Sequence, residues 1–350
     1  MLKSLKIENF RCFPSFEMGQ LGRLNLIVGT NNSGKTSILE ALQLLFSLPT
    51  NPTILSEIVI GRSEYINEDG LTQLVIRHLF YNHKIEEKAQ ISIVGKDQSD
   101  KDEGISISGS STGLSIIHWD DTTNKAQNLS RSLPISPDGI ILLDSQTKKT
   151  WEQSYDNLLS KAQFIDSSSL SSKKMIELFE RIVLTTEEDC VIESLQIIEP
   201  RIKRIANFSS GKYRYEGLHS GFIVQLANES QRIPIGNMGD GMWRILGLAL
   251  AIVNAKDGVL LVDEIDTGLH FTVMSDMWKM IWETAKRLNV QVFATTHSSD
   301  CWTSLADIAN TENPSEDGIT IHRVEKGKQN SIVFTERQIA IAAERHIEVR

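Results

Sequence analysis

The sequence has few cysteines and no long apolar run. Its 350 residues include three cysteines, which are far apart and form no CxxC pair: Cys12, Cys190 and Cys301. Three scattered cysteines without a CxxC pair suggest neither a disulfide framework nor a structural zinc site. No stretch approaches the roughly 18 consecutive apolar residues that indicate a membrane-spanning helix. The first ten residues lack the apolar core of a signal peptide. We therefore expect a soluble, cytoplasmic protein without a membrane partner.

Acidic residues outnumber basic ones by 45 to 36, which gives a net charge of −9. This balance argues against a surface devoted to nucleic acid or to an anionic membrane. One basic stretch would still bind phosphates with a salt-dependent affinity: Arg201, Lys203, Arg204, Lys212 and Arg214. A solvated strand face explains this stretch better because the chain as a whole is negative. DNA stays an alternative partner.

The most informative motif is Gly29–Thr36, which reads GTNNSGKT. It follows the apolar run 24–28 and opens a helical pattern over 37–46, which is the context of a phosphate-binding loop. Two glycines let the backbone turn its N–H groups toward phosphate oxygens, at the positive end of a helix dipole. We expect a nucleoside triphosphate with Mg²⁺ to be bound by Gly29, Thr30, Asn31, Asn32, Ser33, Gly34, Lys35 and Thr36.

Two side chains of this loop have separate predicted roles. The ammonium group of Lys35 reaches the β and γ phosphates and assists catalysis, and the hydroxyl of Thr36 is a ligand for Mg²⁺. A Gly-Ser turn with a buried lysine is the structural alternative. The flanking strand and helix patterns favour the binding loop.

A second functional element is the run 258–264, which reads GVLLVDE and delivers two carboxylates at a strand end. Mg²⁺ keeps several waters and takes few protein carboxylates. We therefore expect Asp263 to hold the ion through a water and Glu264 to orient and deprotonate the attacking water. Acids at a strand end are common, but their pairing with the phosphate loop indicates a hydrolase. His297 follows the next buried strand, 290–295, and is expected to hydrogen-bond the γ phosphate.

The predicted elements indicate an α/β fold in three segments. Residues 1–50 form an N-terminal lobe with the phosphate loop, 51–172 form a β-rich, irregular insert, and 173–350 form a C-terminal lobe. Within the insert, short aliphatic runs predict strands, among them 74–81 and 89–94. The insert contains no sustained heptads, which excludes a long coiled-coil arm.

Five stretches of the chain resemble the ABC-type ATPases of the structural-maintenance-of-chromosomes (SMC) and RecF group. They look most like the AAA-type ATPases of the OLD (overcoming lysogenization defect) family. These stretches are Ile7–Arg11, the GTNNSGKT loop, GNMGDGMWRILGLALA (236–251), LLVDEIDTGLH (260–270) and ATTHS (294–298). The resemblance implies an ABC/RecF-like P-loop ATPase head with a β-rich inserted subdomain. It also implies ATP and Mg²⁺ as ligands and hydrolysis of ATP to ADP and phosphate.

In this group, two heads hold each nucleotide between the phosphate loop of one head and the signature segment of the other. The resemblance therefore implies a homodimer formed through the nucleotide. The signature segment would be Asn237–Met242, where Asn237 or Gly239 replaces the usual phosphate-binding serine. A glycine turn before a core helix is the alternative for this segment. Arg11 matches a basic residue near the nucleotide, although a surface arginine explains it equally well, and Gln163 is the candidate for the Mg²⁺-sensing glutamine.

OLD-family proteins commonly join this ATPase to a C-terminal Toprim nuclease. We expect this chain to lack that domain, because only about fifty residues follow His297, fewer than an additional α/β domain needs. The expected function is an ATPase that dimerises on ATP and gates a separately encoded, nuclease-like effector in DNA maintenance or anti-phage defence. The alternative is an ATP-clamped DNA-binding module in which hydrolysis serves only for release. A transporter ATPase is disfavoured because the sequence lacks LSGGQ.

Overall fold

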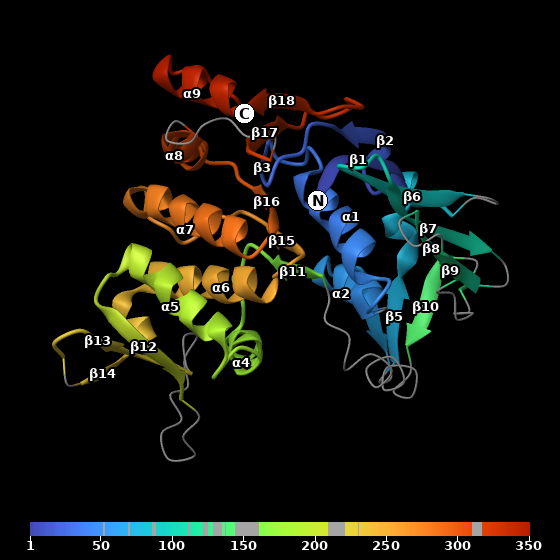
Figure 1. Cartoon of the computed structure of the whole chain (residues 1–350). Coiled ribbons are helices and arrows are strands. Elements are labelled where there is room, and N and C mark those ends of the chain that lie inside the picture. The colour runs from blue at the N-terminus through green and yellow to red at the C-terminus, as the bar shows by residue number, and fades with distance from the viewer. Residues whose placement is uncertain are drawn as a thin grey trace. The chain divides into compact units, whose positions relative to one another are not determined.

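The computed structural model describes residues 1–51, 53–68, 71–85, 89–110, 113–121, 125–128, 135–136, 138–143, 161–208, 221–229, 231–309 and 317–350. The chain divides into two compact units, and neither is continuous in sequence. Unit 1 contains residues 1–22, 28–162 and 322–333, and unit 2 contains residues 23–27, 163–321 and 334–350 (Figure 1).

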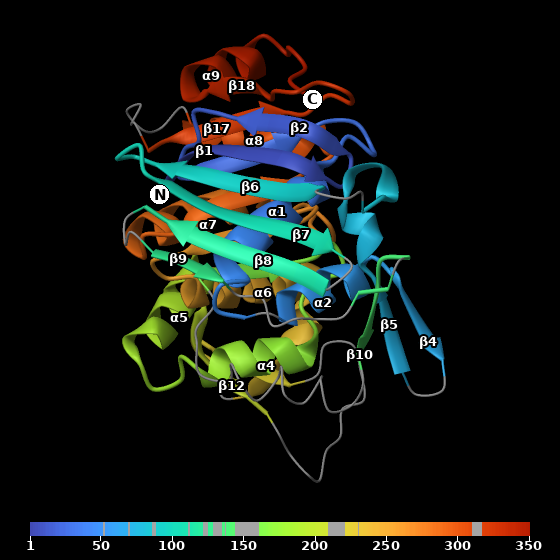
Figure 2. The same cartoon turned by 90° about the vertical axis from the view of Figure 1, so that its right-hand side faces the viewer.

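The main sheet of unit 1 has six strands in the order β2-β1-β6-β7-β8-β9. All its neighbouring strands pair antiparallel. The strands are β1 (Leu2–Phe10), β2 (Phe13–Met18), β6 (Gln90–Asp97), β7 (Asp102–Ser110), β8 (Gly113–Asp120) and β9 (Lys125–Asn128). One face of the sheet is covered by helix α1 (Lys35–Ser47), which contacts β1, β6 and β7 (Figure 2). The core between them contains Ile7, Ile93, Leu42 and Leu45, all fully buried.

The β-rich segment expected after residue 51 extends the sheet that the N-terminal strands begin. β6 pairs with β1, and Ile93 lies opposite Ile7. The predicted boundaries at residues 50 and 172 do not coincide with the two units, because residues 1–50 contribute to both. The three-segment division stays a prediction about the linear organisation of the chain.

A second, three-stranded sheet in unit 1 has the order β10-β5-β4. Its strands are β4 (Tyr65–Glu68), β5 (Leu71–Val75) and β10 (Ile140–Leu143), and helix α2 (Thr53–Gly61) contacts β5. The strand predicted over 74–81 is wrong beyond Val75, where two 3₁₀ turns follow, η1 (Ile76–Leu79) and η2 (Tyr81–His83). The backbone N–H of Arg11 donates to the carbonyl oxygen of Leu79 at 2.8 Å. Residues 76–83 therefore hydrogen-bond to the β1–β2 turn and do not continue the pairing of β5 with its neighbouring strands.

The main sheet of unit 2 has the order β11-β15-β16-β3-β17-β18. Its strands are β3 (Leu24–Val28), β11 (Ala162–Ile165), β15 (Val259–Val262), β16 (Gln291–Thr295), β17 (Ile319–Arg323) and β18 (Ile332–Thr335). β15, β16 and β3 pair in parallel. Every residue of these three strands is buried, as expected for parallel strands covered on both faces. Their carboxyl ends consequently meet at one edge of the sheet.

Six helices belong to unit 2, within the residues described: α4 (Ser172–Glu180), α5 (Thr186–Ile198), α6 (Asp240–Asn254), α7 (Met274–Arg287), α8 (Ser299–Ala309) and α9 (Glu336–Glu344). α5, α6 and α7 contact one another, α7 contacts α8, and α8 contacts α9 (Figure 1). α7 buries an apolar stripe that includes Met277, Trp278 and Ile281, at the spacing of one helix face. A small sheet of β12 (Ile202–Asn207), β13 (Phe222–Leu226) and β14 (Arg232–Pro234) lies beside α5.

Two short 3₁₀ turns precede helices of unit 2: η3 (Ile235–Met238) before α6 and η4 (Phe271–Val273) before α7. None of the helices in the described ranges combines the length and the apolarity that crossing a bilayer requires. The longest of these described helices is α6, with 15 residues.

Candidate functional site

The phosphate loop joins β3 to α1, and its two glycines are required by their surroundings. A Cβ on Gly29 would lie 2.3 Å from the carbonyl oxygen of Val324, and one on Gly34 would lie 2.3 Å from Cζ of Phe13. Gly34 also has a φ of 103°, a left-handed conformation that favours glycine. It is the N-cap of α1, whose first turn contains no acidic residue. The loop therefore ends at a helix N-terminus that favours an anion.

Lys35 lies inside this loop and is only 6% exposed. Its Nζ donates to the carbonyl oxygens of Gly29 at 2.9 Å and of Thr30 at 3.0 Å. The hydroxyl of Ser33 is buried and has no hydrogen-bond partner in the part of the chain that the structure describes. Residues 30–32 are exposed. The loop thus combines an internal cation with a rim that is open to solvent.

Arg11, in the turn between β1 and β2, makes a buried ion-pair network within unit 1. Its Nε donates to Oε2 of Glu40 on α1 at 3.0 Å, and its Nη1 donates to both carboxylate oxygens of Glu64 at 2.5 and 2.7 Å. Arg62 donates to the other oxygen of Glu40 at 2.6 Å. Loss of one partner from such a buried network is costly. The predicted contact of Arg11 with the nucleotide stays a prediction.

The two predicted acids follow β15 in unit 2 and are half-buried. Glu264 has a φ of 46°, a left-handed conformation that costs about 1–2 kcal/mol for a residue with a side chain. Its backbone N–H donates to Oγ1 of Thr295 at 2.8 Å, and this hydroxyl donates to Oδ1 of Asp263 at 2.5 Å. Strained backbone of this kind, held by surrounding bonds, is typical of functional sites. We call Asp263, Glu264 and Thr295 the acid corner.

His297 lies beside the acid corner, two residues after β16 ends. Its Nε2 is 3.9 Å from Oε1 of Glu264, and the two side chains are 37% and 44% exposed. Its carbonyl oxygen accepts a hydrogen bond from Nη1 of Arg350 at 2.6 Å. Within unit 2, the structure thus brings together three residues predicted from two strand ends: Asp263 and Glu264 after β15, and His297 after β16.

A buried arginine that was not predicted as a site residue bonds to the backbone of these acids. Arg244 on α6 is 2% exposed, and its Nη2 donates to the carbonyl oxygens of Asp263 at 3.3 Å and of Glu264 at 3.2 Å. Its Nη1 donates to the carbonyl oxygen of Asp166 at 3.1 Å and to Oγ of Ser169 at 2.9 Å. Burial lowers the pKa of the guanidinium from its usual value. In the sequence, the signal for Arg244 is that it is a single arginine in an apolar helical run. A buried cation needs specific polar partners, so an arginine at such a position is expected to bond to groups of the protein.

The signature-like segment lies just before α6. Asn237 is exposed in η3, and Gly239 is exposed with a φ of 93° directly before the helix. Among the described residues, leaving aside the chain neighbours of Gly239, no heavy atom lies within 4 Å of a Cβ placed there. The positive φ is therefore the feature that favours glycine at this position. Gln163 is 9% exposed on β11, which neighbours β15 in the sheet order. The ligand contacts expected of these residues stay predictions.

The predicted Mg²⁺ ligands, Asp263 and Thr36, both carry side-chain oxygen atoms, the kind of donor that Mg²⁺ prefers. Among the residues that the structure describes, no group of three or more His, Cys, Asp and Glu side chains is placed to hold a metal. A nucleotide-bound Mg²⁺ needs only one or two protein oxygens, since phosphates and water complete its shell. Taken singly, the carboxylate of Asp263 in unit 2 and the hydroxyl of Thr36 in unit 1 are oxygen donors of this kind.

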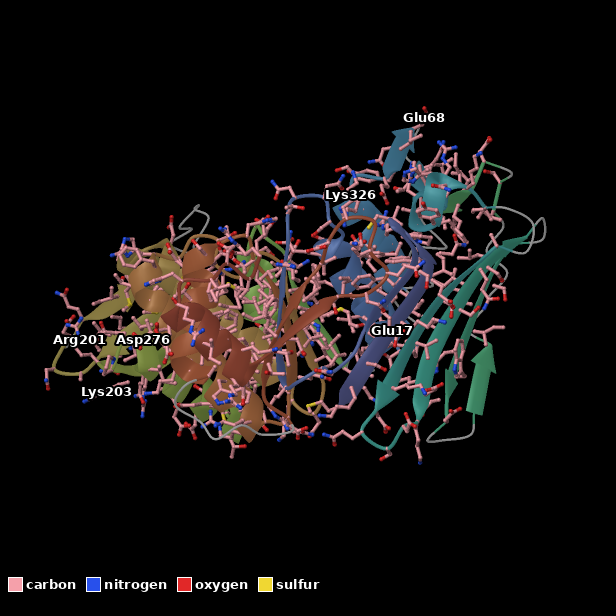
Figure 3. All side chains as sticks on the ribbon, turned by 90° about the horizontal axis from the view of Figure 1, so that it is seen from above. Glu17, Glu68, Arg201, Lys203, Asp276 and Lys326 are labelled. Carbon is pink, nitrogen blue, oxygen red and sulfur yellow. The ribbon has the colours of Figure 1, made fainter. Side chains whose placement is uncertain are left out.

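The basic stretch on β12 is described only in part. Arg201 and Lys203 reach outward at the edge of unit 2 (Figure 3), and Arg204 is also exposed. Nε of Arg201 lies 2.9 Å from Oε1 of Glu199, and its Nη1 lies 3.8 Å from Oε1 of Glu229. These two acids offset its charge locally. The remaining predicted members lie outside the described residues: Lys212 and Arg214.

Residues 1–301 match the family model described as AAA ATPase domain. An ATP/GTP phosphatase of Helicobacter pylori is 23% identical over 332 residues, which are 86% of this chain and 86% of that protein. An OLD nuclease of Thermus scotoductus is 49% identical over 45 residues, which are 13% of this chain and 8% of the nuclease.

The same fold occurs in a solved Smc head domain with an extended coiled coil, bound to the C-terminal domain of ScpA derived from Pyrococcus furiosus. It is 13% identical, covers 99% of each chain and has a TM-score of 0.51. The predicted α/β P-loop ATPase head and the predicted resemblance are confirmed. The chain belongs to the AAA ATPase domain family and is an ATPase.

Proposed function

We propose that this ATPase hydrolyses Mg²⁺-bound ATP with the phosphate loop and the acid corner, and that two copies close on the nucleotide to gate a separate effector. The acid corner is the observation that carries the proposal. Its backbone is strained at Glu264 and is held by Thr295 and Arg244. Preorganised groups of this kind accelerate a reaction because they do not reorganise as it proceeds.

The presence of both motifs in one chain supports one nucleotide for the loop and the acids. A phosphate-binding loop together with an aliphatic strand that ends in Asp263 and Glu264 indicates a nucleoside-triphosphate hydrolase. Within unit 2, Asp263 directly follows β15, and ligands of open α/β sheets bind at the carboxyl ends of the strands. On this motif argument, we assign the loop and the acids to the same nucleotide.

The chemical roles follow from the side chains. Glu264 accepts a proton from the water whose oxygen bonds to the γ phosphorus, while the bond from this phosphorus to the leaving oxygen of ADP breaks. Lys35 offsets charge on the β and γ phosphates, and His297 donates a hydrogen bond to the γ phosphate. Thr36 and Asp263 would hold Mg²⁺, which neutralises phosphate charge when bound.

The replacement Glu264→Gln tests this assignment, because it keeps the size of the side chain and removes the base. We expect kcat to fall by at least about 100-fold, the contribution of a general base, while a fluorescent ATP analogue binds within about threefold of the original affinity. Glu283→Gln is the matched control, since Glu283 is an exposed residue of α7. Unchanged turnover in Glu264→Gln would remove Glu264 from the mechanism.

The proposed dimer uses the signature-like segment as the second wall of the site. Asn237 and Gly239 are exposed just before α6, where helix N–H groups favour a phosphate from another copy. The proposed effector is separately encoded and nuclease-like, and the process is DNA maintenance or phage defence. The local match to an OLD nuclease supports this choice. Purification of Glu264→Gln with ATP, together with the product of a neighbouring nuclease-like gene, tests it by co-elution.

The alternative of an ATP-clamped DNA-binding module receives less support. Arg201 is paired with acids, and the net charge of the chain is −9. Reversal of the two exposed charges Lys203 and Arg204 to glutamate tests it. Equal DNA affinity before and after this change, over a range of salt concentrations, removes the stretch as a DNA contact.

A further inference from the structure

Two consecutive threonines at the end of β16 make matching pairs of hydrogen bonds. Oγ1 of Thr295 accepts from the backbone N–H of Glu264 at 2.8 Å and donates to Oδ1 of Asp263 at 2.5 Å. Its hydroxyl therefore links the backbone of one acid to the carboxylate of the other. A hydroxyl has one proton to donate and two lone pairs, so this one group serves both acids of the corner.

Thr296 repeats the arrangement toward other partners. Its Oγ1 accepts from the backbone N–H of Ser298 at 2.9 Å and donates to Oδ1 of Asp266 at 2.5 Å. Ser298 is the residue after His297, and Asp266 lies two residues after Glu264. This second hydroxyl therefore ties the turn that carries the histidine to the loop that follows the acids.

Burial and the backbone fix both threonines. Each is fully buried. The carbonyl oxygen of Thr295 accepts from the N–H of Ile265 at 3.0 Å, and the N–H of Thr296 donates to the carbonyl oxygen of Ile27 on β3 at 3.2 Å. Hydrogen bonds from hydroxyls to carboxylates are roughly twice as strong as those between neutral groups. These residues are thus rigid donors between strands.

We propose that Thr295 and Thr296 are positioning residues for ATP hydrolysis. Thr295 orients Asp263 and Glu264, and Thr296 fixes the turn of His297. The inference rests on the proposed function, because it takes the roles of Glu264 and His297 from there. It adds that the relative position of the acids and the histidine is set by two hydroxyls that do not touch the nucleotide.

Valine and serine replacements separate shape from hydrogen bonding. Valine keeps the branched shape of threonine, but it leaves a carboxylate without its donor and a backbone N–H without its acceptor. Serine keeps the hydroxyl and loses one methyl group. Thr320→Val is the matched control, because Oγ1 of Thr320 donates to Oδ1 of Asn25 at 2.9 Å in the same sheet, and its residue is 8% exposed.

The experiment measures kcat and KM for ATP, the binding of a fluorescent ATP analogue at rising Mg²⁺ concentration, and the thermal unfolding midpoint. We expect Thr295→Val and Thr296→Val each to lower kcat by about 10–100-fold, the usual cost of losing a supporting hydrogen bond at such a site. KM should change by less than about threefold, since the phosphate loop is untouched. Thr295→Val should also need more Mg²⁺ for tight analogue binding, whereas Thr296→Val should not.

The serine variants and the control decide between positioning and general stability. Thr295→Ser and Thr296→Ser should turn over ATP within about threefold of the original rate, and Thr320→Val should leave kcat and Mg²⁺ dependence unchanged. The inference is overturned if kcat of both valine variants equals that of the original protein. It is also overturned if Thr320→Val or the serine variants lose as much kcat as the valine variants. Alanine variants provide a second series if a valine variant does not fold.

The outcome is distinguishable from a failure of the proposed function. If Glu264→Gln abolishes turnover and the valine variants do not slow it, only the positioning inference fails. If Glu264→Gln remains active, the proposed role of the acid fails first. In either case analogue binding reports whether each variant is folded.

Discussion

Nε2 of His297 lies 3.9 Å from Oε1 of Glu264, and the side chains come from the ends of two paired parallel strands. This distance exceeds the roughly 2.7–3.2 Å of a hydrogen bond. The imidazole and the carboxylate are therefore neighbours that do not hydrogen-bond to each other directly. Both are more than a third exposed, so each side chain can turn toward a ligand.

We predict that His297→Gln lowers kcat by about 10–100-fold, because the γ phosphate loses a hydrogen bond that matters most in the transition state. Binding of an ATP analogue should stay within about threefold. Steady-state kinetics and an analogue titration measure the two effects. His346→Asn is the control, since His346 is exposed and its φ of 52° suits asparagine. If the affinity for the analogue fell by the same factor as kcat, His297 would instead contact the bound nucleotide already in the ground state.

We predict that Lys35→Met weakens binding of an ATP analogue by at least about tenfold, since hydrogen bonds to charged groups contribute about 1.5–3 kcal/mol. The buried ammonium bonds to the carbonyl oxygens of Gly29 and Thr30, so the empty loop should also lose some order. Titration calorimetry measures the affinity. The exposed Lys279 of α7 supplies the control Lys279→Met. Equal affinity in the two variants would contradict the assigned role.

His322 on β17 predicts a dependence of stability on pH. It is fully buried, and burial lowers its pKa to about 3. An unfolded chain binds this proton near pH 6.5, whereas the folded chain does not. The free energy of unfolding should therefore fall as the pH drops from about 6.5 toward 3, by up to about 1.4 kcal/mol per pH unit from this group.

Urea unfolding of the original protein and of His322→Gln between pH 7.5 and pH 5 measures this contribution. The variant should show a shallower loss of stability over that range because it carries no titrating group at this position. His346→Asn serves again as the exposed control. Parallel pH profiles for the original protein and His322→Gln would show that His322 is not protonated on unfolding.

Parts of the site were predictable because they depend on local patterns. The buried runs of β3, β15 and β16 have the continuous apolar composition of parallel strands. The residues after such strands lie at one sheet edge in any α/β fold, so the placement of Asp263, Glu264 and His297 near one another was predictable, while their roles stay predictions. The glycines of the phosphate loop were found from their spacing.

Other parts depend on contacts between residues far apart in sequence. Arg244 reaches the acids from α6, and Thr295 joins them through its side chain. The sequence contains no periodic pattern from which either contact could be predicted. The nucleotide contact of Arg11 stays a prediction, and the sequence carries no signal for the bonds of its guanidinium to Glu40 and Glu64. The strand predicted over 74–81 ended early because the turn of Arg11 bonds to its backbone. Tertiary partners decided each case.

The exposed signature-like segment predicts an ATP-dependent dimer. Glu264→Gln should retain bound ATP, and its mass by light scattering should rise from 39.3 kDa to about twice that value when ATP is added. Asn237→Asp in the same background keeps the shape of an exposed side chain and adds a negative charge. It should stop dimerisation by repelling the phosphates of the other copy's nucleotide, while each monomer binds an ATP analogue with unchanged affinity. A monomer at every ATP concentration would contradict the dimer, and a dimer that persists in Asn237→Asp would place the contact elsewhere.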